Sequence, residues 1–151
     1  MKILIFLLLL TSCASNLRIQ VIPSYFYSSN KEMIDKSLKI ISKNCRPKNK
    51  IVLNLKFDIM PQMLVDLNPN QIGHTSFYPD STLIETNIHK YAYMNPQEQL
   101  VYFLHESGHV IGLEHVSSTD HVMHSFNTSL AEIKQFESEV YNHCSNIKDI
   151  P

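Results

Sequence analysis

The chain has 151 residues, and 13 Lys and Arg stand against 14 Asp and Glu, so its formal net charge is −1 at pH 7. This near balance gives no electrostatic basis for binding nucleic acid, and no polybasic stretch indicates attachment to a membrane surface. The length suits one domain with one hydrophobic core, and no repeat or interdomain linker divides it.

The chain begins with one lysine and a short apolar run. The run Ile3–Leu10 is far shorter than the roughly 20 residues that cross a bilayer, so residues 1–12 are interpreted as a secretory signal peptide. The segment Leu10-Thr11-Ser12-Cys13 resembles a bacterial lipobox. The resemblance implies cleavage before Cys13 and its acylation, hence an exported lipoprotein; an ordinary signal peptide is the alternative. Ala14 carries no inner-membrane retention signal, which favours the outer membrane.

Residues 13–151 then form a single domain that opens with a strand, a helix and a strand. Residues Asn16–Ile22 alternate apolar and polar side chains, which predicts the first strand. Ser29 and Glu32 match a capping box, and apolar residues recur after them at helical spacing, so a helix is expected to run toward Pro47. The second strand is expected at Ile51–Asp58, which also alternates.

The next part of the chain predicts a loop and two further strands. Met60–Asn70 holds two prolines and is interpreted as a loop with at most one short strand. Ile72–Pro79 is expected to form a strand, Asp80-Ser81 a turn, and Leu83–Ile88 the last strand.

A strong start signal precedes the next helix. Asn95 is a favourable cap, Pro96 suits the first turn, and Glu98 stands three residues after the cap. Gly108 costs this helix about 1 kcal/mol of propensity, so we expect a close backbone approach there. Gly108 is expected to face the sheet together with Leu100, Leu104 and Ile111.

This helix ends in the sequence His-Glu-Ser-Gly-His-Val-Ile-Gly-Leu-Glu-His, which starts at His105. Residues four apart lie one above the other on a helix, so His105 and His109 point at the same spot. Glu106 lies about 100° further round the helix. Gly112 permits a sharp turn, after which His115 completes a set of three nitrogen ligands that leaves a fourth position for water.

The pattern H-E-x-x-H-x-x-G-x-x-H resembles the zinc signature of the metzincin metalloproteases, and its matrixin branch most of all. The resemblance implies a compact α+β domain: a mixed, twisted sheet of four to five strands with about three helices, one of which carries the motif. It also implies one catalytic Zn²⁺ on His105, His109 and His115, with Glu106 as general base and acid. Met123 corresponds to the methionine of the turn beneath the metal. His124-Ser125-Phe126 lacks the proline that follows in matrixins, so their pocket selectivity is not carried over.

The segment before the turn at Asp80-Ser81 resembles the matrixin edge strand, which binds an extended peptide through its backbone. The residues concerned are Gly73, His74, Thr75 and Ser76. A second, structural zinc is not expected, because His74 and His89 are the only candidate ligands near it and no matching aspartate is evident.

Polar residues after the motif offer alternatives. His121 and His124 could close the metal site as a fourth ligand, steady an oxyanion, or be solvated. Asp120 is a candidate for orienting a ligand from behind, whereas Glu114 is expected to be exposed.

The C-terminal segment predicts a last helix and a cysteine pair. Ser129 and Glu132 are expected to cap this helix, with Leu130, Ile133, Phe136 and Val140 facing inward. Cys45 and Cys144 are the cysteines that remain after Cys13, and a disulfide between them is expected in an exported protein. Two free thiols, or an inhibitory Cys45 thiolate on zinc, are the alternatives.

These features together predict a zinc-dependent endopeptidase, tethered by lipid to the cell envelope and monomeric, that acts on protein or peptide substrates. The rival is a non-catalytic, zinc-stabilised peptide-binding lipoprotein. A zinc hydrolase acting on something other than protein is a third possibility. Glu106 argues against the binding protein, since a structural site has no need of that carboxylate, and it favours peptide chemistry over the third possibility.

Overall fold

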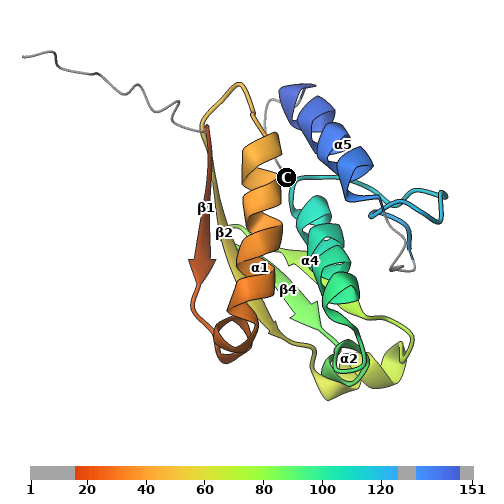
Figure 1. Cartoon of the computed structure of the whole chain (residues 1–151). Helices are drawn as coiled ribbons and strands as arrows, with labels where there is room; N and C mark the ends of the chain where they lie inside the picture. Colours follow the sequence, from red (N-terminus) through yellow and green to blue (C-terminus); the bar gives the residue numbers. More distant parts are fainter. Residues whose placement is uncertain (1–15, 126–131, 147–151) are drawn as a thin grey trace, which may run out of the picture.

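The computed structural model describes residues 16–125 and 132–146, which form a four-stranded sheet with helices packed on it (Figure 1). The strands are β1 (Leu17–Ile22), β2 (Ile51–Ile59), β3 (Gly73–Phe77) and β4 (Thr82–Thr86), in the order β1-β2-β4-β3. β1, β2 and β4 run parallel, and β3 runs antiparallel to β4. The sheet is therefore mixed, as expected, and the outer backbone edge of β3 pairs with no other strand of the described residues.

The strands follow the alternation of the sequence. In β2 the side chains of Leu53, Leu55 and Phe57 are buried, while Val52 just before them is 47% exposed. One face of the strand thus joins the core and the other does not, which is the arrangement that a period of two predicts. The two predicted strands at Asn16–Ile22 and Ile51–Asp58 are confirmed to within a residue.

Three long helices complete the core: α1 (Tyr25–Asn44), α4 (Pro96–Val110) and α5 (Ile133–Asn146). α1 and α4 lie side by side on one face of the sheet, and α5 packs against α1 (Figure 1). Aromatic rings join these layers, since Phe103 of α4 lies 6.0 Å from Phe57 of β2 and 6.3 Å from Phe26 of α1, measured between ring centroids. α4 therefore lies in the core, and its residues Leu100–Gly108 are all buried.

The start of α1 differs from the prediction. Ser24, not Ser29, is the N-cap, and its side chain accepts the backbone N–H of Tyr27. The predicted capping box at Ser29 and Glu32 falls at a kink, where Asn30 has the non-helical angles φ −119° and ψ 17°. The sequence signal there marks the junction of two helical segments rather than the beginning of the helix.

Two short helices replace stretches that were assigned otherwise. α2 (Gln62–Leu67) occupies the predicted loop, directly after Pro61. α3 (Ile88–Tyr91) begins where the last strand was expected to end, so that strand is shorter than predicted. α2 buries none of its residues, so no buried face supports it. The described chain has five helices where about three were expected.

A disulfide joins Cys45, the C-cap of α1, to Cys144 of α5. Both cysteines are fully buried. Cys45 is therefore neither a free thiol nor a thiolate that inhibits the metal site. None of the helices in the described part of the chain is both long and apolar enough to span a membrane.

Candidate metal centre

The helix that carries the motif begins as its sequence predicts. The Asn95 side chain accepts the backbone N–H groups of Gln97 and Glu98, and the Glu98 carboxylate accepts the N–H of Asn95. This capping box fixes the first turn of α4. The register of the helix then places His105 and His109 one turn apart on the same side.

The chain reverses directly after α4 and brings back a third histidine. Gly112 has a φ of 89°, a conformation that side chains with a Cβ rarely adopt. Beyond this turn the Nε2 atom of His115 lies 3.1 Å from Nε2 of His105 and 3.1 Å from Nε2 of His109, and the latter two atoms are also 3.1 Å apart. Two histidines from α4 and one from the segment after the turn thus converge on one point.

The Nδ1 atoms of His105 and His109 determine the protonation of the Nε2 atoms that face one another. Nδ1 of His105 donates to the backbone oxygen of Val122 at 2.8 Å, and Nδ1 of His109 donates to that of Leu113 at 2.9 Å. In the neutral tautomer that makes these bonds, Nε2 has a lone pair and no proton. Lone pairs that face one another at this distance repel unless a cation lies between them. The three histidines lie close enough to bind one metal ion.

Burial keeps two of these donors neutral. It lowers the pKa of His105 to about 4 and also lowers the pKa of His109, while the hydrogen bonds to Val122 and Leu113 oppose the shift. His105 is buried, His109 half-buried and His115 exposed. The cluster is therefore anchored inside the protein and opens to solvent at His115.

Glu106 lies beside the cluster and is 5% exposed. The hydroxyl of Thr75 on β3 donates to its Oε2 atom at 2.7 Å. A Cβ atom added to Gly73 would lie only 2.2 Å from Oε1, so the absence of a side chain there makes room for the carboxylate. Burial raises the pKa of Glu106 to about 7, and the Thr75 hydrogen bond opposes this rise. Such a shift is typical of carboxyls that transfer protons.

Two hollows meet at these residues. One, of about 450 Å³, extends along β3 past Thr75 and Phe77, and the other, of about 410 Å³, extends past Asn68 and Asn70. Both are lined by Gln71, Gly73, Glu106 and His115. Of the predicted edge-strand residues, Gly73, His74 and Thr75 therefore line a cleft together with the three histidines and Glu106, whereas Ser76 does not.

Met123 lies behind the cluster and is fully buried. A Cβ atom at Gly108 would lie 2.4 Å from its sulfur and 3.3 Å from the ring of Phe136 on α5. The close approach predicted at Gly108 is confirmed, but its partners are Met123 and α5 rather than the sheet. Met123 thus fills the space under α4 with an adaptable apolar side chain.

Other candidates lie away from the three donor atoms. His74 contacts Gln71, and His121 contacts Glu139. Asp120 accepts a hydrogen bond from Ser118 and is not among the groups that contact the histidine ligands in the described residues. Glu114 is exposed, as expected. Within the described ranges, the one group of three or more His, Cys, Asp or Glu side chains close enough to hold a metal ion is His105, His109 and His115, and neither His121 nor His124 belongs to it.

Two functional contacts were not expected from the sequence. They are the Thr75 hydroxyl on Glu106 and the backbone N–H of Met123 on Nδ1 of His121, at 3.0 Å. Both depend on segments that the fold brings together, and no local spacing announces them. Cys13, Phe126, Ser129 and Leu130 lie outside the described residues.

Comparisons of the chain with family models, curated proteins and solved structures find no match.

Proposed function

We propose that the protein is a zinc-dependent endopeptidase of the metzincin type, with matrixins as the branch it resembles. The observation that carries this proposal is the position of Glu106. Its buried carboxylate stands next to three converging histidine nitrogens, at the point where the two hollows along β3 meet. A metal site that only stabilised the fold would not need a buried carboxylate beside its ligands.

The donor set supports zinc as the metal. Imidazole nitrogen suits zinc among other transition metals, and three protein ligands with one open position are typical of catalytic rather than structural zinc sites. Zn–N distances of about 2.0–2.1 Å are compatible with three nitrogens that lie 3.1 Å apart. The described residues supply no fourth protein ligand to this cluster.

Zinc, when bound, would act as a Lewis acid that polarises the scissile carbonyl and makes water acidic enough to attack near neutral pH. Glu106 takes the proton from the attacking water and delivers it to the leaving amine. Because Oε2 accepts the Thr75 hydroxyl, Oε1 is the oxygen that carries this proton. Gly73 leaves the space in which Oε1 lies.

The substrate is proposed to be an extended peptide that lies along β3. The outer edge of β3 presents backbone N–H and C=O groups, and such an edge binds a further strand by main-chain hydrogen bonds. This mode requires no particular side chain in the substrate. It would place the scissile bond in the cleft that Glu106 and the three histidines line.

The tether belongs to the same proposal. Cleavage before Cys13 and acylation of that cysteine would keep the enzyme on the cell envelope, with the outer membrane favoured. The peptidase would then act on proteins of the envelope or of the surrounding medium as a monomer.

Digestion of a peptide library by the purified protein tests the proposal. We expect cleavage that stops when a zinc chelator is added and returns when Zn²⁺ is restored. A peptide-binding lipoprotein would instead retain peptides without cutting them. Intact peptides after incubation with protein whose bound zinc has been measured would therefore reject the peptidase and favour the binding protein.

A further inference from the structure

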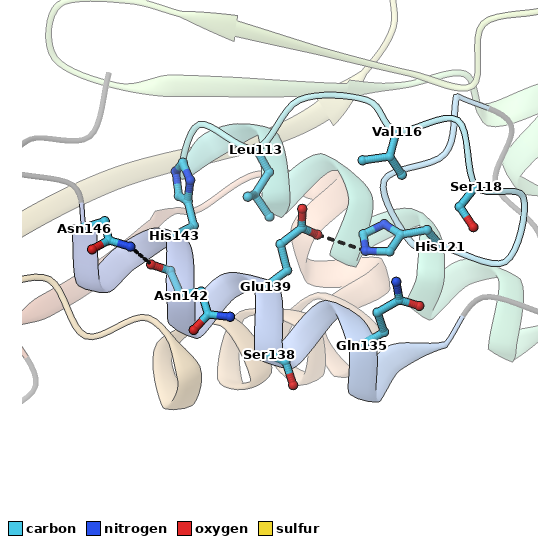
Figure 2. A pocket seen from close by; sticks show the side chains of 10 residues that line it. All are labelled: Leu113, Val116, Ser118, His121, Gln135, Ser138, Glu139, Asn142, His143 and Asn146. Carbon is cyan, nitrogen blue, oxygen red and sulfur yellow. Dashed lines mark hydrogen bonds and ion pairs between the residues drawn. The ribbon is translucent and has the colours of Figure 1, made fainter.

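A second polar site lies on the far side of the turn that follows the metal centre. It is a hollow of about 670 Å³ between α5 and the segment 113–121 (Figure 2). In its wall, Nε2 of His121 lies 2.9 Å from Oε2 of Glu139, and Figure 2 shows these side chains pointing toward each other from the turn and from α5. None of the reaction steps proposed above uses either residue.

The other ring nitrogen of His121 fixes its tautomer. Nδ1 accepts the backbone N–H of Met123 at 3.0 Å, so it has no proton of its own. The ring proton is then on Nε2, which lies within ion-pair distance of Oε2 of Glu139. That oxygen is buried and has no hydrogen-bond partner among the described residues, so His121 is the nearest group able to satisfy it. His121 is 4% exposed, and although the Glu139 side chain is 34% exposed, its Oε2 atom is buried, so the contact itself is shielded from water.

The peptide group between Val122 and Met123 connects this pair to the metal centre. Its N–H is accepted by His121, and its carbonyl oxygen accepts Nδ1–H of His105 at 2.8 Å. One peptide plane is thus held from both sides. An unbroken series of contacts runs from Glu139 through His121 and this peptide to the first histidine ligand.

We propose that His121 and Glu139 are positioning residues that set how strongly His105 binds the metal. Glu139 holds His121 in one tautomer and orientation, His121 fixes the peptide plane, and the carbonyl of that plane fixes the ring of His105. Hydrogen-bond partners behind a ligand orient it and raise its basicity, and their loss commonly lowers metal affinity by about 10- to 100-fold. The inference depends on the metal centre alone and holds whether or not the protein cleaves peptides.

The anchoring of α5 supports this role. Cys144, five residues after Glu139 on the same helix, is joined to the end of α1 by the disulfide. Phe136 and Val140 on either side of Glu139 are fully buried. Glu139 therefore acts from a helix that is held to the core both covalently and by packing, which suits a group that positions another.

The test compares Glu139→Gln with Glu137→Gln. Both remove one negative charge from α5, but Glu137 lies about 200° around the helix from Glu139. Zn²⁺ affinity is measured by competition with a chromophoric chelator, and the stability of the metal-free proteins by urea unfolding. We expect Glu139→Gln to bind Zn²⁺ about tenfold more weakly than the parent, and Glu137→Gln to bind it as tightly as the parent. The two metal-free variants should have equal free energies of unfolding.

Two results would overturn the inference. One is equal Zn²⁺ affinity of the two variants. The other is a loss of affinity in Glu139→Gln that accompanies an equal loss of metal-free stability, since that would indicate a structural role only.

A second measurement uses the unaltered protein and therefore tests the proposal even if Glu139→Gln does not fold. Long-range ¹H–¹⁵N NMR of the histidine rings reports which nitrogen has the proton. We expect it on Nε2 of His121 and on Nδ1 of His105, with and without Zn²⁺. A proton on Nδ1 of His121 would break the series of contacts and reject the proposal.

Discussion

The imidazoles of His105 and His109 are each held at Nδ1, and their Nε2 atoms point at the centre of the histidine cluster. Backbone oxygens of Val122 and Leu113 accept the Nδ1 protons of His105 and His109. Neither acceptor is a side chain, so neither is visible as a motif. The spacing of the histidines identifies the ligands, whereas the groups that orient them come from the fold.

The hydroxyl of Thr75 offers a test of how Glu106 is positioned. Thr75→Val keeps the shape of the side chain but removes the donor to Oε2. A hydrogen bond to a charged group contributes about 1.5–3 kcal/mol, so we expect kcat for peptide cleavage to fall roughly tenfold or more, with bound zinc unchanged. Steady-state kinetics of the two proteins, with zinc content measured on the same samples, check this.

Thr75→Ser is the matched control, because serine restores the hydroxyl at the same position. It should recover most of the parent kcat. If valine and serine behave alike, the hydroxyl does not position Glu106.

The elements of the fold were predictable to the extent that each buries one face. β1 and β2 alternate in sequence and are found where expected, and α4 has an unambiguous cap. α2 buries none of its residues, so the rule that an element buries one face does not apply to it. Ser24 and Ser29 are both of a residue type that caps helices. Ser24 is the cap that forms, and it directly precedes the segment in which Phe26 is buried.

The contact between α4 and the turn beneath it gives a prediction at this scale. Gly108→Ala would favour the helix by propensity, yet its Cβ would lie 2.4 Å from the sulfur of Met123. Met123 and Phe136 are fully buried, so neither can move aside freely. We expect the free energy of unfolding to fall by about 1–3 kcal/mol, as is usual for overpacked cores. Urea unfolding of the metal-free protein measures it.

The same substitution in a Met123→Ala background isolates the cause. There the added methyl group meets less resistance, and the cost of Gly108→Ala should shrink clearly. A Gly108→Ala protein more stable than the parent would show that helix propensity outweighs the contact.

At the scale of the whole molecule, the disulfide joins the ends of α1 and α5 across 99 residues of sequence. Closing a loop of this size restricts the unfolded chain by at most about 4.7 kcal/mol on the chain-entropy model. The sequence predicts this disulfide but also leaves two free thiols or an inhibitory Cys45 thiolate as alternatives. Composition alone does not decide whether two thiols meet. Burial of both residues against the core brings them together.

Replacing both cysteines by serine tests this contribution. We expect the free energy of unfolding to fall by about 2–5 kcal/mol, measured by urea unfolding without reductant. The reduced parent protein is the control and should unfold like the double variant. Equal stability of the oxidised parent and the double variant would contradict the expected role.

The central claim is that Glu106 performs proton transfer beside a zinc ion held by three histidines. The most direct measurement is the rate of peptide cleavage by Glu106→Gln, together with its zinc content. The account predicts full zinc and a rate reduced by about 100-fold or more, the usual effect of removing a general base, whereas His109→Ala should lose the metal and exposed His89→Ala should change neither. A Glu106→Gln protein that retains zinc and cleaves at the parent rate would contradict it.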